Sequence, residues 1–148
     1  MDRNKQYHKS FQSRFQVYRG VVQAIPNGVN TGINFDTVQY DPLDEYDEAI
    51  LYQFTPLQAG YYLLKAGLTF GVLPIGSIYG IILFVDAGIV HRDFRESFIG
   101  TLGIADISRL YYLTPANVVS ISAFQASGVG QNVWAGLNRT FLEGFRWG

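Results

Sequence analysis

Residues 52–70, YQFTPLQAGYYLLKAGLTF, are the stretch that decides the fold. In its second half the apolar residues recur at every other position and form one face: Tyr62, Leu64, Ala66, Leu68 and Phe70. The opposite face is mixed and holds Tyr61, Leu63, Lys65, Gly67 and Thr69. This alternation predicts a long β-strand with one face on a core and the other towards solvent or another subunit. Because the two tyrosines have opposite parity, at most one of them shares the core with Leu64.

Further strand-forming segments, separated by turns that contain Pro, Gly or Asn, occur on both sides of this stretch. The predicted strands are residues 15–18, 33–40, 49–54, 61–70, 78–85, 89–94, 118–125 and 140–147. Residues 95–110 are left open, because 105–110 fit either a helical turn or a short strand. Altogether about nine or ten short strands without an amphipathic helix indicate an all-β sandwich or barrel.

The size of the chain predicts a single domain. Its 148 residues can bury one core, and we expect the domain to span residues 15–148. Residues 1–14 are predicted to form a basic N-terminal arm, partly disordered because termini are usually loose unless tied down. The 11 Phe, 10 Tyr and 16 Gly favour strands punctuated by turns. A net charge of −1 gives no global attraction for phosphate backbones, so no nucleic-acid partner is expected.

The residue types that enzymes use most are scarce. There is no cysteine, which excludes thiolate catalysis, thiolate metal sites and disulfides. The two histidines, His8 and His91, lack the spacing of a zinc site. Glycoside hydrolysis would need two carboxylates from Asp47, Asp106 and Glu143 to meet in space, and a carbohydrate-active hydrolase is the least favoured hypothesis. The protein is therefore predicted to be no enzyme and to need no cofactor.

Residues 41–48, DPLDEYDE, form a candidate cation-binding loop. Its oxygen donors would be Asp41, Asp44, Glu45 and Asp47, and calcium is the ion that such a loop would take. The regular Asp spacing and the turn glycine of an EF-hand are absent. A plain solvated loop is the favoured alternative, since most charge runs are simply hydrated.

The chain carries no segment typical of membrane targeting. Residues 1–15 lack the apolar run of a signal peptide. The most apolar run, residues 78–90, is interrupted by Gly80, Asp86 and Gly88. We therefore expect no membrane insertion, and export by a route other than a classical signal peptide.

Three segments resemble motifs of one protein family. They are residues 33–40 (INFDTVQY) with Tyr46 and Asp47, residues 54–62 (FTPLQAGYY), and residues 141–145 (FLEGF). Together they resemble the globular head domain of the C1q and tumour-necrosis-factor superfamily, of a bacterial or phage type. The resemblance spans about residues 15–147. Residues 113–118, LTPANV, depart from the family's usual turn, and there is no collagen stretch.

The resemblance implies a ten-stranded jelly roll that assembles as a homotrimer, with aromatic residues of one sheet at the threefold axis. The interface candidates are Tyr61 or Tyr62, Phe141 and Phe145. Glu143 shares their parity and would need a partner in apolar surroundings. We expect that partner to be Arg139 or Arg146 of a neighbouring chain.

The function expected from the sequence is a homotrimeric binding or adhesion head on a cell, spore or virion surface. Loops at one end would contact a surface protein or a glycan. The lack of cysteine favours a bacterial or phage origin over an animal secreted one. The alternative is a structural jelly-roll subunit that builds a particle or shell.

Overall fold

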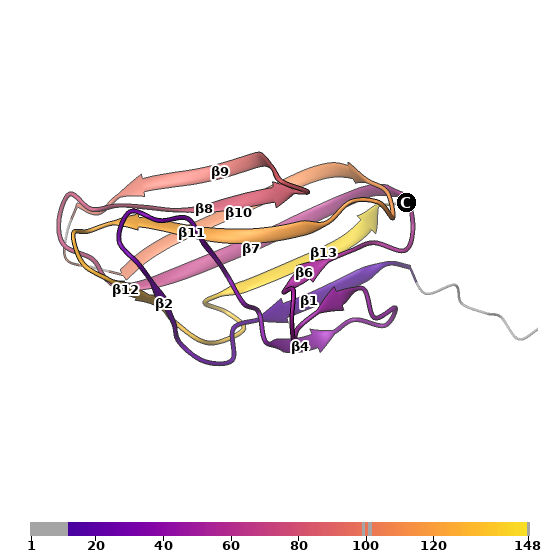
Figure 1. Ribbon diagram of the computed structural model, residues 1–148, viewed down its shortest axis with the longest axis horizontal. Helices are drawn as coiled ribbons and strands as arrows, with labels where there is room; N and C mark the ends of the chain where they lie inside the picture. Colours follow the sequence, from indigo (N-terminus) through magenta and orange to yellow (C-terminus); the bar gives the residue numbers. More distant parts are fainter. Residues whose placement is uncertain (1–11, 99, 101, 148) are drawn as a thin grey trace, which may run out of the picture.

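The computed structural model describes residues 12–98, 100 and 102–147 (Figure 1). In this part of the chain there are thirteen strands and no helix. The strands form two antiparallel sheets packed face to face, which confirms the predicted all-β jelly-roll sandwich. None of these residues belongs to a helix long and apolar enough to cross a membrane. Most of the predicted N-terminal arm, residues 1–14, lies outside the described residues.

The two sheets differ in size. The first has seven strands: β2 (Gln23–Ile25), β12 (Gln131–Val133), β7 (Gly60–Val72), β13 (Phe141–Trp147), β1 (Arg14–Tyr18), β4 (Thr37–Tyr40) and β10 (Leu102–Leu113). The second has six: β5 (Tyr46–Asp47), β6 (Gln53–Phe54), β11 (Val119–Ala126), β8 (Ile78–Val85), β9 (Gly88–Glu96) and β3 (Thr31–Gly32). The count exceeds ten because five segments are only two or three residues long.

Strand β7 is the centre of the first sheet. It pairs along its whole length with β10 on one side, and with β13 and β12 on the other. The predicted inner face is confirmed, because Tyr62, Leu64, Ala66, Leu68 and Phe70 are all buried in the core. The strand is longer at both ends than the alternation alone predicts.

An aromatic cluster fills one end of the core. The rings of Phe15 and Phe54 stack with centroids 4.0 Å apart. Tyr62 meets Phe54 edge on at 5.7 Å, and Tyr46 lies parallel to Phe15 at 6.0 Å. These four rings come from both sheets, so they hold the two layers together at this end.

The predicted strand at residues 49–54 is wrong for its first four residues. Only Gln53 and Phe54 are in a strand. The Asp47 carboxylate accepts hydrogen bonds from the amides of Ala49 and Ile50, both at 3.0 Å, and so closes a turn. Tyr52 has a φ of 52°, which no strand residue adopts.

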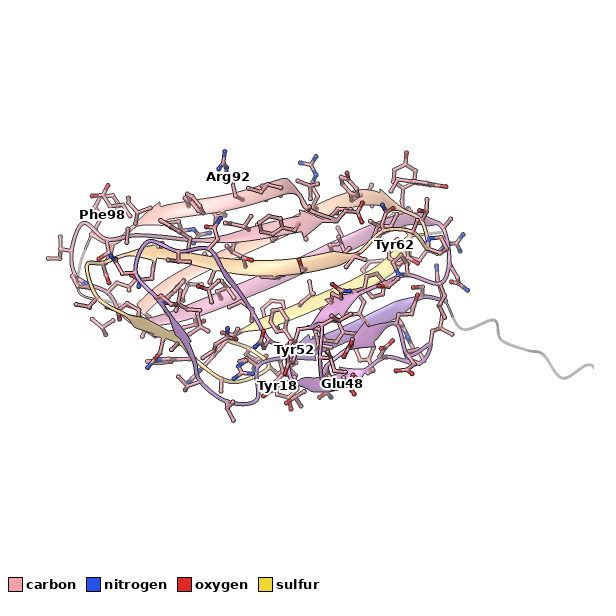
Figure 2. The ribbon with its side chains drawn as sticks, viewed as in Figure 1. Tyr18, Glu48, Tyr52, Tyr62, Arg92 and Phe98 are labelled. Atoms are coloured by element: carbon pink, nitrogen blue, oxygen red, sulfur yellow. The ribbon has the colours of Figure 1, made fainter. Side chains whose placement is uncertain are left out.

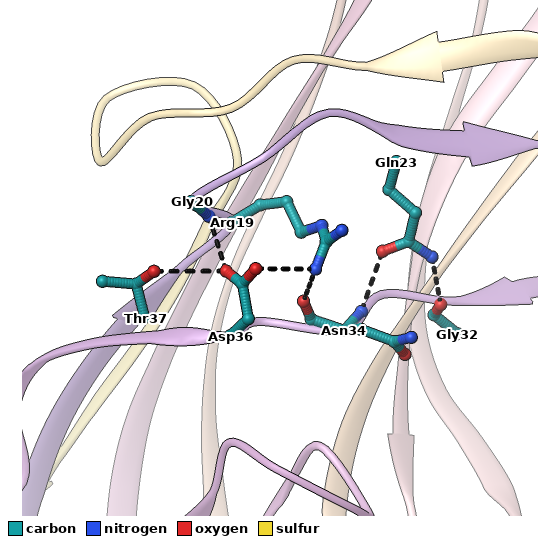
Figure 3. A network of polar contacts seen from close by, with 7 residues as sticks. All are labelled: Arg19, Gly20, Gln23, Gly32, Asn34, Asp36 and Thr37. Atoms are coloured by element: carbon teal, nitrogen blue, oxygen red, sulfur yellow. Dashed lines mark hydrogen bonds and ion pairs between the residues drawn. The ribbon is translucent and has the colours of Figure 1, made fainter.

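The predicted strand at residues 33–40 is likewise shorter, since β4 covers only its second half. Figure 3 shows the side-chain contacts that hold its first half in place. Asp36 accepts from Arg19 Nη1 at 3.1 Å and from the Gly20 amide at 2.6 Å. Gln23 bridges the Gly32 carbonyl at 2.8 Å and the Asn34 amide at 2.9 Å.

The segment that the sequence left open is a strand. Residues 102–113 form β10, which runs antiparallel to β7 through twelve register pairs. Its inward positions include Gly103, Ala105 and Ile107, all buried. The predicted hairpin of β8 and β9 is confirmed, with a left-handed Asp86 (φ 55°) at its turn.

Candidate functional site

The face of the first sheet that points away from the second sheet is the candidate site, and we call it the open face. It is built from the positions of β10, β7 and β13 that alternate with the buried ones. Register pairs align these positions in four rows across the strands. The rows are Tyr112, Tyr61 and Trp147; Leu110, Leu63 and Phe145; Ser108, Lys65 and Glu143; and Asp106, Gly67 and Phe141.

The first two rows expose large apolar side chains. Tyr61 is 54% exposed, Tyr112 51% and Trp147 64%. The rings of Tyr61 and Tyr112 meet edge on at 5.2 Å. Leu110 and Phe145 of the next row are also exposed, and the Phe145 ring lies 6.3 Å from that of Trp147. Adjacent exposed rings of this kind mark an interaction surface rather than the scattered apolar residues of an ordinary surface.

Hollows lie beside these projecting rings. The Phe141 ring lies over Gly67, where an added Cβ would come 2.7 Å from ring atom Cε1. A hollow of about 330 Å³ opens next to it, lined in part by Ile104, Asp106 and Arg139. The open face therefore has projecting rings in its first two rows and a hollow beside Phe141.

The structure places four of the predicted interface residues on the open face and one in the core. Tyr61, Phe141, Glu143 and Phe145 all lie on the open face. Tyr62, labelled in Figure 2, does not: it is fully buried within its own chain. Its hydroxyl donates to the Gln58 carbonyl at 2.6 Å, and burial raises its pKa. The core position thus belongs to Tyr62, and Tyr61 is the tyrosine available to a partner.

The predicted partners of Glu143 are already engaged within their own chain. The Arg139 guanidinium lies 4.8 Å from the centre of the Trp134 ring. Arg146 Nε donates to the Ala59 carbonyl at 2.8 Å. Glu143 itself accepts a hydrogen bond from Gln16 Nε2 at 3.0 Å.

The sequence did not place the open-face residues of β10 on this surface. Leu110 and Tyr112 are among them, because the strand character of residues 102–113 was not predicted. Gly103, Ala105 and Ile107 at alternate positions are the signal that could have identified the strand, but Arg109 interrupts it.

The acidic loop does not assemble a ligand set. Glu45 is turned inward and accepts from Ser13 Oγ at 2.6 and 2.8 Å and from the Leu57 amide at 2.6 Å. Asp41 accepts from the Tyr46 amide at 2.8 Å. Across residues 12–98, 100 and 102–147, no three His, Asp or Glu side chains converge in a way that could hold a metal ion. Asp41 and Glu45 instead accept hydrogen bonds from nearby parts of the chain.

The three carboxylates of the hydrolase hypothesis are spread over both sheets. Asp47 lies in the second sheet, whereas Asp106 and Glu143 lie on the first. The Asp106 side chain is 67% exposed and lies 3.7 Å from Arg95. The three carboxylates do not form a group.

Two carboxylates of the acidic loop have shifted pKa values of opposite sign. Burial raises the pKa of Asp41, partly offset by the amides of Glu45 and Tyr46. The amides of Ile50 and Ala49 lower the pKa of Asp47, because they stabilise its charged form.

The pKa of Asp47 predicts a pH effect. A carboxylate whose pKa is lowered on folding stabilises the protein above the unfolded value, and this stabilisation is lost as the pH falls through the folded value. We expect NMR titration to give Asp47 a midpoint below the value of about 3.9 for an ordinary Asp. Asp47→Asn should flatten the acid side of the stability curve. An unchanged acid side would contradict this assignment.

Comparison with known proteins bears on the fold. No family model and no curated protein matches the chain by sequence. Among solved structures, a TNF named Eiger from S. frugiperda superposes with a TM-score of 0.71 at 8% identity, covering 93% of each chain. Murine APRIL has a TM-score of 0.67 at 12% identity, over 92% of this chain and 99% of that chain. The globular domain of zebrafish complement 1qA has a TM-score of 0.61 at 16% identity, over 91% and 97%.

The chain has the C1q/TNF-like fold. The resemblance seen in the sequence is thereby confirmed at the level of fold. In this C1q/TNF-like sandwich the open face lies on the sheet of β10, β7, β13 and β1. The identities of 8–16% carry the architecture alone.

Proposed function

We propose that the protein is a non-enzymatic binding head that works as a homotrimer, with the three open faces packed around the threefold axis. The observation that carries this proposal is the double row of exposed aromatic and aliphatic side chains on the open face. Covering such a surface removes apolar area from water at roughly 25 cal/mol per Å². A second copy of this chain is the occupant that the C1q/TNF-like fold suggests.

The shape of the open face supports a ring of copies. Its projecting rings lie at the Tyr61 end of β7, whereas the hollow beside Phe141 lies further along the strand. A contact between two different surface features is heterologous, and heterologous contacts form a ring when the rotation between copies closes. Three copies around an axis would bury the Tyr61, Tyr112 and Trp147 row.

The contact with a partner is proposed for the loops at one end of the sandwich. Strand β7 begins beside Trp147, near the C-terminus, and ends at Val72. The loop after Val72 therefore lies at the opposite end, and Figure 2 shows Phe98 at that end too. The loops at this end formed by residues 73–77 and 127–130 contain no charged side chain. An uncharged surface protein or glycan would suit these loops.

The proposed setting is the outside of a cell, spore or virion of bacterial or phage origin. A head of this kind needs only a rigid scaffold and exposed loops, so no reacting groups have to converge. This agrees with the scattered positions of Asp47, Asp106 and Glu143.

Light scattering after gel filtration tests the assembly. We expect a single species of three times the chain mass of 16.6 kDa at micromolar concentration. A stable monomer would contradict the proposal. Growth into larger shells would favour the alternative, a structural subunit of a particle.

A further inference from the structure

Two opposite charges lie side by side in the middle of the open face. Lys65 on β7 and Glu143 on β13 are register partners on the same side of the sheet. The row before them is Leu110, Leu63 and Phe145, and the row after them is Asp106, Gly67 and Phe141. The two charges therefore have apolar side chains on both sides, with Asp106 at the edge of the second row.

Within one chain the two charges do not form an ion pair. The three ion pairs found among the described residues involve neither of them. Glu143 is bonded to Gln16 at 3.0 Å, on the side away from Lys65. Lys65 is exposed, and its side chain has no hydrogen-bond partner among residues 12–98, 100 and 102–147. A recess of about 190 Å³, lined by both residues with Tyr40, Leu63 and Phe145, lies open above them.

Covering this face would make both charges costly unless they gain partners. A charge removed from water without an opposite charge or hydrogen bonds destabilises the assembly. Other charges near the face already have contacts within the chain: Arg139 with Trp134, Asp106 with Arg95, and Arg14 with the Tyr40 ring. Lys65 of one copy and Glu143 of another can then satisfy one another.

We propose that Lys65 of each copy forms an ion pair with Glu143 of the next copy around the threefold axis. This inference rests on the proposed homotrimer. In a threefold ring each copy gives its Lys65 to one neighbour and its Glu143 to the other, so every charge is paired once. The pair fixes the register of the rings against the hollows, because any other register leaves like charges or unpaired charges inside the interface.

Charge reversal tests the pair. We expect Lys65→Glu and Glu143→Lys each to raise the concentration of half-assembly by about tenfold or more, because each creates three like-charge contacts per trimer. The double variant K65E/E143K should assemble like the wild type. Circular dichroism will show whether each variant is folded. Lys65→Gln and Glu143→Gln, which remove a charge without reversing it, should give a smaller loss in the same assay.

Mixing the two single variants separates a pair between copies from a pair within one chain. In each variant alone, positions 65 and 143 carry the same charge, so neither variant should assemble well. A mixture places the carboxylate introduced by Lys65→Glu in one copy against the ammonium group introduced by Glu143→Lys in the next. Trimers with two favourable contacts out of three should then form. A pair within one chain would gain nothing from mixing, and this result would overturn the inference.

A control and the wild type complete the experiment. Arg92→Glu makes the same reversal from positive to negative charge as Lys65→Glu, but on the outside of β9. Figure 2 shows Arg92 pointing away from the sandwich, so this variant should leave assembly unchanged. If the wild type is a trimer and both single-reversal variants still assemble as well as it does, the ion pair is overturned but the homotrimer is not. A wild type that stays monomeric would overturn the homotrimer and the ion pair together.

Discussion

Replacing Phe54 by alanine is expected to lower the free energy of unfolding by about 3–5 kcal/mol. The Phe54 ring is fully buried, stacks on Phe15 at 4.0 Å and meets Tyr62 edge on. Strand β6 has only two residues and a single register pair with β11. Packing of this ring, more than backbone pairing, therefore holds the segment on the sandwich. Chemical denaturation monitored by circular dichroism measures the loss.

Phe98→Ala is the matched control for this prediction. The same atoms are removed, but Phe98 is 77% exposed and has no buried contact to lose. Its effect should stay within about 0.5 kcal/mol, as for most surface substitutions. Comparable losses in the two variants would show that the aromatic cluster is not what stabilises this end of the core.

The residues 61–70 were predictable because alternation is a direct property of strand geometry. Each side chain of an extended chain points opposite to its neighbours, so hydrophobic parity alone placed Leu64 and Phe70 in the core. The same rule stated that only one of Tyr61 and Tyr62 could be buried. Tyr62 has the same parity as Leu64, and the structure buries both of them.

The errors at residues 33–36 and 49–52 have a different physical cause. Both segments are rich in apolar residues, yet side chains far or near in sequence satisfy their backbone amides before a strand can. In the first segment Gln23 Oε1 accepts from the Asn34 amide, and in the second the Asp47 carboxylate accepts from the amides of Ala49 and Ile50. Competition by polar side chains for backbone amides is well known, but its outcome depends on which loop lies nearby in the fold.

The candidate site was only partly predictable, because it is assembled from three strands. Phe141, Glu143 and Phe145 were identified through their shared parity on one strand. Lys65 was noticed only as a charge on a mixed face. Its significance depends on the register that sets it beside Glu143, and register across strands distant in sequence is not encoded locally.

Phe145→Asp is expected to convert the proposed trimer into a folded monomer. The side chain is 41% exposed in the single chain, so a carboxylate there stays hydrated in the monomer and should cost little stability. In the trimer the same carboxylate would lie between the Trp147 row and the charged row, close to Glu143, where desolvation and like charge both oppose assembly. Gel filtration with light scattering measures the mass, and thermal unfolding followed by circular dichroism measures the fold.

The second sheet offers a closely matched control for this variant. Phe94 on β9 is 42% exposed and, like Phe145, lies against another ring, that of Phe124 at 5.5 Å. Phe94→Asp therefore introduces the same group at the same exposure, but on the opposite side of the sandwich. If assembly depends on the open face, Phe145→Asp abolishes the trimer and Phe94→Asp preserves it. The reverse result would move the interface to the second sheet, and equal sensitivity would mean that the mass reports general loss of structure rather than a specific contact.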